Sequence, residues 1–170
     1  MPLQTAADDK QGNRRSQLVQ NKGLVLADFK VLVVYYSRSG MTRRVAEAIA
    51  RSLNGDLEQI TERSPREGIF GYIRSLVQAR NATSADIEPT LHDVSRYNLV
   101  IVGTPVWGWS MSSPVRTYLA QQAAHLPCVA FFCTYQGSGA ERALGQMEAA
   151  AGKAAIATCA VTQSEIDGNG

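Results

Sequence analysis

The stretch "VLVVYYSRSGMTRRVAEAIA", residues 31–50, joins an apolar run to an amphipathic one. Residues 31–36 are β-branched, aliphatic or aromatic without interruption, which is typical of a strand buried on both faces of a parallel sheet. Beyond the turn "SRSG", apolar Val45, Ile49 and Leu53 recur every fourth residue and predict an amphipathic helix. Such a turn places N–H groups and hydroxyls at the positive end of a helix, where anions bind. The stretch therefore predicts a strand, an anion-binding turn and a helix.

The same alternation of strands and helices continues along the chain. Further strands are expected at residues 56–60, 98–103, 128–133 and 154–161, and helices at residues 41–53, 69–80, 114–123 and 140–151. Five strands alternating with helices predict an α/β fold built on a doubly wound, five-stranded parallel sheet with right-handed crossovers.

Length and charge restrict the domain organisation. A chain of 170 residues with 45% hydrophobic content is long enough for one domain with a sizeable core. Residues 1–23 are polar with little periodicity, and residues 1–28 are interpreted as a flexible or partly packed leader, followed by a single domain over residues 29–170. Residues 31–170 carry twelve basic and twelve acidic side chains, which argues against nucleic acid as a partner.

The cysteines and the hydropathy pattern indicate a cytoplasmic protein. Cys128, Cys133 and Cys159 are too few and too scattered for a disulfide framework or a metal site, and are interpreted as buried thiols. No apolar run approaches the roughly 20 residues that span a membrane, so no membrane span is expected.

Ligands of doubly wound sheets bind outside the carboxyl ends of the strands, where the strand order reverses. The loops that follow the first, third and fourth expected strands are "SRSGMT", "TPVWGWSMSSP" and "TYQGSGAE". All three are rich in hydroxyls, glycines and aromatic residues, and none contains an acid before Glu141. The sequence therefore predicts one site that these loops share.

These segments resemble the flavodoxin family. "VVYYSRSGMTRRVAEAI" matches the family signature at every position, namely Val33, Val34, Tyr35, Ser37, Gly40, Thr42 and Ala46. "GTPVWGW" resembles the tryptophan-bearing second flavin loop of that family, and the loop after "FFCTY" resembles the third. The resemblance covers residues 31 to 161 and implies the flavodoxin-like strand order 2-1-3-4-5 and bound FMN.

The expected flavin contacts follow from the three loops. Hydroxyls and backbone N–H groups of the first loop suit a monophosphate, although the same turn also fits a simple helix N-cap. Trp107 is expected to stack on one face of the flavin and Tyr135 on the other, whereas Trp109 fits the core as well as the flavin site. The predicted cofactor-binding residues are Ser37, Arg38, Ser39, Gly40, Met41, Thr42, Thr104, Pro105, Val106, Trp107, Gly108, Thr134, Tyr135, Gln136, Gly137, Ser138 and Gly139.

Several other site types are excluded by the pattern. "GSGAER" fails as a dinucleotide fingerprint at Arg142, where a third glycine is required. A receiver domain needs acids where this chain has Ser37, Arg38 and Thr104. His92 and His125 have no partner in the sequence pattern, so no catalytic residue is assigned.

The resemblance implies an FMN-binding redox protein that transfers electrons through its flavin. One form of this function is an NAD(P)H-dependent reductase of quinones or other small acceptors. The other is a one-electron carrier that docks on redox protein partners, a role for which typical flavodoxins have a strongly acidic surface. A flavin-free interaction module on the same fold is a third alternative.

The end of the sequence differs from the family pattern. After the fifth expected strand the chain reads "TQSEIDGNG", whereas the family ordinarily adds a final helix over one face of the sheet. Because both faces of a parallel sheet must be covered, we expect the apolar part of residues 1–28 or a second copy in a homodimer to cover that face.

Overall fold

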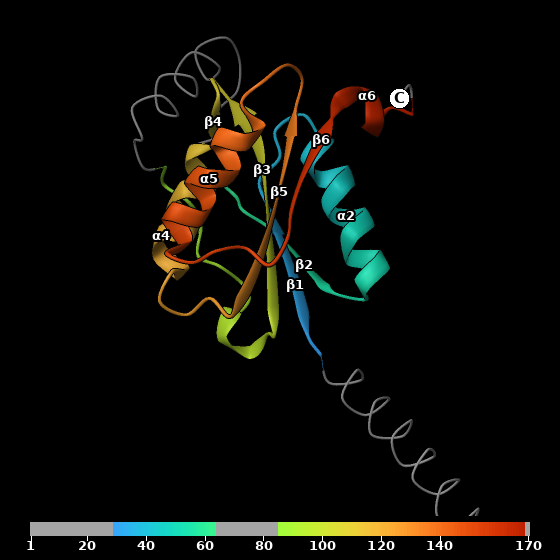
Figure 1. Cartoon of the computed structure of the whole chain (residues 1–170). Coiled ribbons are helices and arrows are strands. Elements are labelled where there is room, and N and C mark those ends of the chain that lie inside the picture. The colour runs from blue at the N-terminus through green and yellow to red at the C-terminus, as the bar shows by residue number, and fades with distance from the viewer. Residues whose placement is uncertain (1–28, 64–84, 169–170) are drawn as a thin grey trace, which may run out of the picture.

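The computed structural model describes residues 29–63 and 85–168 (Figure 1). The strands are β1 (Val31–Tyr35), β2 (Asp56–Gln59), β3 (Leu99–Trp107), β4 (Ser110–Met111), β5 (Cys128–Tyr135) and β6 (Thr158–Thr162). The helices are α2 (Met41–Leu53), α4 (Ser113–Gln122), α5 (Ala140–Ala151) and the short α6 (Gln163–Ile166), with a 3₁₀ turn, η1, over Val94–Arg96. The predicted leader and the predicted helix at 69–80 lie outside the described residues.

The strands form one sheet in the order β2-β1-β3-β5-β6, and all of these neighbours run parallel. Since β5 and β6 are the fourth and fifth strands of the expected set, the doubly wound sheet with order 2-1-3-4-5 is confirmed. Helices α4 and α5 cover one face of the sheet, and α2 with α6 lies on the other (Figure 1). The carboxyl ends of β1, β3 and β5 consequently meet at the same edge.

Alternating side chains of the central strands supply both halves of the core. Leu32 and Val34 of β1 belong to the apolar cluster beneath α4 and α5. Val31, Val33 and Tyr35 belong to the cluster beneath α2. This double burial explains why the strand is apolar at every position rather than at alternate ones.

Two strands differ from their predicted bounds by four residues at one end, and the other strands differ by one or two residues. β3 continues through Trp107 because its last residues pair with β4 in a short antiparallel hairpin, which turns part of the predicted loop into a strand. β6 begins at Thr158 rather than at residue 154. Gly152 ends α5 with a φ of 68°, and the Glu148 carboxylate accepts a hydrogen bond from the N–H of Ala155, so the intervening residues turn before the strand starts.

The interpretation of all three cysteines as buried thiols is wrong for two of them. Cys133 is buried, and burial raises the pKa of its thiol to about 11. Cys128 is exposed because it begins β5 at the end of the sheet, and Cys159 is exposed because it lies on the edge strand β6. In the described part of the chain, β6 pairs with β5 alone.

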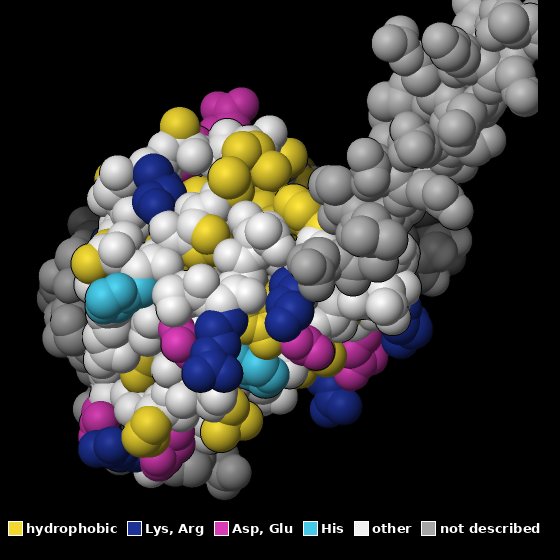
Figure 2. Space-filling model, turned by 90° about the horizontal axis from the view of Figure 1, so that it is seen from below, with side chains coloured by type: hydrophobic (Ala, Val, Ile, Leu, Met, Phe, Trp, Pro, Cys, Tyr) yellow, Lys and Arg dark blue, Asp and Glu magenta, His cyan; other side chains and the backbone are white. Residues whose placement is uncertain are grey.

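The surface shows no dominant sign of charge at the end of the molecule remote from the carboxyl edge. Lys and Arg side chains are interspersed there with Asp and Glu side chains (Figure 2). Within residues 29–63 and 85–168, every helix is too short or too polar to cross a membrane.

Candidate functional site

The loops after β1, β3 and β5 enclose a cavity of about 830 Å³ at the carboxyl edge of the sheet. Its lining comprises Arg38, Ser39, Met41, Pro105, Val106, Trp107, Gly108, Trp109, Thr134, Tyr135, Gln136, Gly137 and Ser138. Twelve of these thirteen are predicted cofactor-binding residues, and Trp109 is the addition. The three sequence segments thus meet around one space, as their positions after parallel strands require.

The first loop leaves the start of α2 open to an anion. Gly40 is the N-cap residue with a φ of 89°, a left-handed conformation that glycine adopts without strain. The hydroxyl of Ser37 accepts a hydrogen bond from the N–H of Gly40 at 3.1 Å, which closes the turn. No side chain caps α2, and its first turn contains no acidic residue. Backbone N–H groups at this helix start therefore remain available to an anionic ligand.

A buried pair of hydroxyls connects the first loop to the third. Thr42 is 1% exposed and Thr134 is 3% exposed, and their Oγ1 atoms lie 2.8 Å apart. In such a pair one hydroxyl donates and the other keeps its own proton, so the pair retains one donor for a further partner.

The two tryptophans take different positions. Trp107 is half-buried at the end of β3, and its ring meets that of Tyr36 edge to face with centroids 5.4 Å apart. Trp109 is 62% exposed, so the alternative that placed it in the core is wrong. It lines the same cavity as Trp107 and Tyr135, so the site has three aromatic residues in its wall where two were predicted.

Trp109 also fixes the second loop to the third. Its Nε1–H donates a hydrogen bond to the Ser138 hydroxyl at 2.8 Å. Its φ of 62° is left-handed, which is unusual for a bulky residue. A Cβ at Gly139 would lie 2.7 Å from the Cα of Trp109, so the loops approach closely only because residue 139 is glycine. We call this contact the rim latch.

Five predicted site residues do not line the larger cavity: Ser37, Gly40, Thr42, Thr104 and Gly139. Ser37 and Gly40 shape the first turn, whereas Thr42 and Gly139 join loops to each other. Thr104 is fully buried and exchanges hydrogen bonds with the backbone N–H and hydroxyl of Ser112. Their direct contact with a flavin stays a prediction.

A smaller cavity of about 490 Å³ adjoins the larger one and was not predicted. The two share Ser39, Met41 and Gln136, and the smaller is lined in addition by Gly40, Arg43, Arg44, Glu47, Gln163 and Asp167. The charged members form two ion pairs, Arg43 with Glu47 at 2.7 Å and Arg44 with Asp167 at 2.8 Å. "TQSE" at 162–165 is a capping-box pattern, and it is the signal that predicts the helix turn on this side.

The electrostatic character of the larger cavity is neutral to positive. Arg38 is the one charged residue among the described residues that line it, and no carboxylate is among them. Among the same described residues, no group of three or more His, Cys, Asp or Glu side chains is arranged to hold a metal ion.

The fold is similar to that of several solved structures. A flavoprotein from Lactobacillus acidophilus, solved in complex with FMN, is 25% identical, with a TM-score of 0.69 over 82% of this chain and 97% of that one. Candidate flavoproteins from Bacteroides eggerthii and Bacteroides uniformis share the fold at 21% and 18% identity. Their TM-scores are 0.67 and 0.69, over 82% and 83% of this chain and 94% and 95% of theirs.

The family assignment follows from the sequence as well as from the fold. No curated protein gives a significant match to the chain. The family model described as Flavodoxin matches residues 30–166, which include all three loops of the site. The chain therefore belongs to the flavodoxin family.

Proposed function

We propose that this protein binds FMN in the larger cavity and transfers electrons through the bound flavin. The observation that carries the proposal is the start of α2, which no side chain caps and which opens into a cavity with two tryptophans in its wall. A flat ring with a terminal phosphate fits both features. FMN, when bound, supplies electron transfer in single or paired steps.

The phosphate end fits the chemistry of the first loop. Backbone N–H groups of the first turn of α2 and the hydroxyls of Ser37, Ser39 and Thr42 are the donors that a phosphate needs without a metal ion. The dipole of α2 favours negative charge at this position, and no acidic side chain in the first turn opposes it. We assign these residues to phosphate binding.

The ring end fits the second and third loops. Trp107 and Trp109 reach the cavity from one loop and Tyr135 from the other, so a planar ring can lie between aromatic side chains. Gly137 is exposed in the third loop, and a Cβ at that position would meet nothing within 4 Å. This open space leaves room for the polar edge of a flavin beside the backbone of the third loop.

Within this function, we favour an NAD(P)H-dependent reductase of quinones or other small acceptors. Negative charge on a reduced flavin is most costly next to carboxylates, and the described lining of the larger cavity contains none. Paired electron transfer from a hydride donor is therefore not opposed by the nearby charges.

A one-electron carrier is the second candidate, because the rim of the cavity lies at the surface. Gln136, Gly137 and Ser138 are all exposed, and Trp109 is 62% exposed. A protein partner could approach a flavin edge at this rim without a conformational change.

Two measurements on the purified chain separate the candidates. Addition of FMN followed by removal of free ligand should leave a yellow protein with flavin absorption, and a colourless protein would favour the flavin-free module. Oxidation of NADH or NADPH that accelerates on addition of a quinone supports the reductase. Absence of such oxidation, together with fast electron exchange with a one-electron acceptor protein after chemical reduction, supports the carrier.

A further inference from the structure

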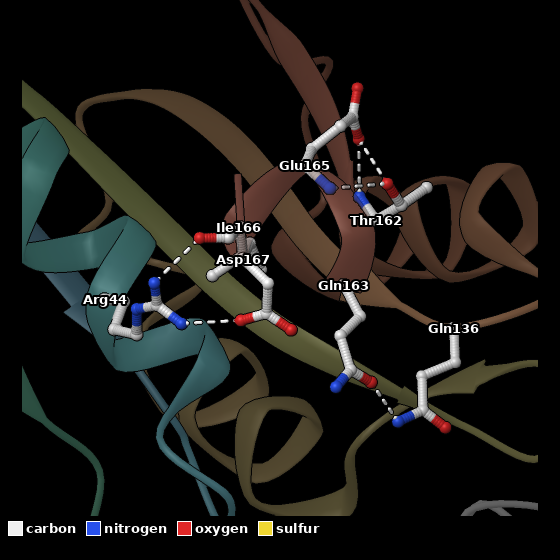
Figure 3. A network of polar contacts seen from close by, with 7 residues as sticks. All are labelled: Arg44, Gln136, Thr162, Gln163, Glu165, Ile166 and Asp167. Atoms are coloured by element: carbon white, nitrogen blue, oxygen red, sulfur yellow. Dashed lines mark hydrogen bonds and ion pairs between the residues drawn. The ribbon is translucent and has the colours of Figure 1, made fainter. Parts of the chain in front are cut away.

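The last described helix turn lies beside the start of α2 and holds it through one arginine (Figure 3). Arg44 Nη1 donates to Asp167 Oδ1 at 2.8 Å, and Arg44 Nη2 donates to the carbonyl oxygen of Ile166 at 2.7 Å. The backbone N–H of Arg44 meanwhile donates to the Gly40 carbonyl at 3.0 Å. The same residue therefore connects α6 to the turn that we assign to phosphate binding.

A second contact connects α6 to the third loop. Gln136 Nε2 donates to Gln163 Oε1 at 2.5 Å. Figure 3 shows the two side chains pointing toward each other. Gln136 lines both cavities, and Gln163 and Asp167 line the smaller one. Helix α6 thus contacts the start of α2, directly after the first loop, and the third loop itself.

Helix α6 has only four residues, but a capping box stabilises its start. The Thr162 hydroxyl accepts from the N–H of Glu165 at 3.3 Å, and the N–H of Thr162 donates to Glu165 Oε2 at 2.7 Å. This is a complete capping box. The Thr162 hydroxyl also donates to Glu165 Oε2 at 2.7 Å, and this bond, followed by the one from the Thr162 N–H, lowers the pKa of Glu165. The turn that presents Gln163 and Asp167 is consequently fixed at its start.

We infer that α6 is a clasp that positions the phosphate-binding turn, with Arg44 and Gln163 as positioning residues for FMN. The inference rests on the proposed binding of FMN. The clasp contacts the start of α2 and the third loop from outside the larger cavity, so its residues act through the turn and through Gln136 rather than on the flavin ring.

The effect is expected in binding rather than in stability. The side chains of Arg44 and Asp167 are 57% and 39% exposed, and exposed ion pairs contribute little to the free energy of unfolding. A displaced turn, in contrast, weakens several hydrogen bonds to a charged phosphate at once. The melting temperature of a clasp variant should therefore stay unchanged while its affinity for FMN falls.

The Asp167→Ala substitution separates the clasp from simple charge. On charge alone, removal of a carboxylate near the phosphate should tighten FMN binding. If α6 is a clasp, the same substitution should raise the Kd for FMN about three- to tenfold. Glu47→Ala is the matched control, because Glu47 also lines the smaller cavity and pairs with an adjacent arginine, but has no hydrogen bond or ion pair with α6 among the described residues.

Three further variants complete the test. Arg44→Ala should weaken FMN binding more than Arg43→Ala, which removes the same charge one residue away. Gln163→Ala should weaken FMN binding as well. The double variant Arg44→Ala, Asp167→Ala should bind FMN no less tightly than whichever single variant has the lower affinity, because both substitutions remove the same contact. Riboflavin, which lacks the phosphate, should lose less affinity than FMN in each case.

The outcomes distinguish the inference from the function on which it rests. If Asp167→Ala binds FMN as tightly as the unchanged protein, or more tightly, the clasp is refuted and FMN binding stands. If the unchanged protein does not bind FMN, the proposed function fails and the clasp fails with it.

Discussion

Thr42 and Thr134 are 92 positions apart in the sequence, yet their hydroxyl oxygens lie 2.8 Å apart in a buried hydrogen bond. One belongs to the first turn of α2 and the other to the end of β5. The contact means that the turn we assign to phosphate binding and the third loop of the site share one buried hydrogen bond. Substitution of either threonine should therefore change the affinity for FMN.

We predict that Thr42→Val lowers the affinity for FMN by about 1.5 to 3 kcal/mol, the contribution of a hydrogen bond to a charged group. Ser37→Ala should have a similar effect. Thr134→Val should also weaken binding, and the double variant with Thr42→Val should fall short of the sum of the two single effects. Titration with FMN and riboflavin by fluorescence checks this. Equal losses for the two ligands would show that the turn does not hold the phosphate.

The rim latch predicts that Gly139→Ala destabilises the protein by about 1 to 3 kcal/mol. The added Cβ would meet the Cα of Trp109 at 2.7 Å, and the φ of 99° disfavours any side chain. FMN and riboflavin affinity should fall together, because the latch serves the ring and not the phosphate.

Gly145→Ala is the control for that substitution. Gly145 lies in α5, and a Cβ there meets nothing within 4 Å. Alanine at this exposed position of the helix should stabilise the protein by about 0.5 to 1 kcal/mol. Chemical denaturation of both variants gives their free energies of unfolding. An unchanged free energy of unfolding for Gly139→Ala would contradict a stabilising role of the rim latch.

Trp107 should quench the fluorescence of bound flavin by stacking on it. Trp107→Ala should restore emission and weaken binding by about 1 to 3 kcal/mol, the range for stacking on an aromatic platform. Because Trp107 also contacts Tyr36, the free energy of unfolding of the variant must be measured in parallel. Restoration of emission by Trp109→Ala alone would transfer the stacking role to Trp109.

The proposal that residues 1–28 or a second copy covers the face beside α2 has a direct test. Phe29 is 51% exposed, and Cys128 and Cys159 are also exposed. Deletion of residues 1–27 should lower the melting temperature if this segment covers the face. Sedimentation of the full chain as a dimer would support the second copy instead. A truncated monomer of unchanged stability, obtained from a monomeric full chain, would contradict both versions.

The sequence predicts the strands and helices well where periodicity and burial agree. β1 and α2 differ from expectation by one residue at most, because a doubly buried strand and an amphipathic helix have distinct patterns. β3 is longer than predicted since a hairpin with β4 depends on cross-strand pairing that no local pattern shows. The resemblance to a family, rather than periodicity, provided the strand order.

The sequence predicts most of the residues that line the candidate site. It does not predict the hydrogen bonds and ion pairs that join these segments to each other. Hydroxyls, glycines and aromatic residues after parallel strands indicate which loops converge. The ion pair of Arg44 with Asp167 joins residues 123 positions apart, and in sequence both are ordinary surface charges. The position of Trp109 could not be predicted from the sequence either. It depends on a contact with Gly139, 30 residues later, where the backbone of Trp109 is left-handed.

The most direct test of FMN binding is calorimetric titration of the 170-residue chain with FMN and with riboflavin under identical conditions. We predict one site per chain and an affinity for FMN at least about tenfold higher than for riboflavin, since the phosphate adds charged hydrogen bonds at the start of α2. Equal affinities would contradict the assignment of the turn, and no binding of either ligand would contradict the proposed function itself.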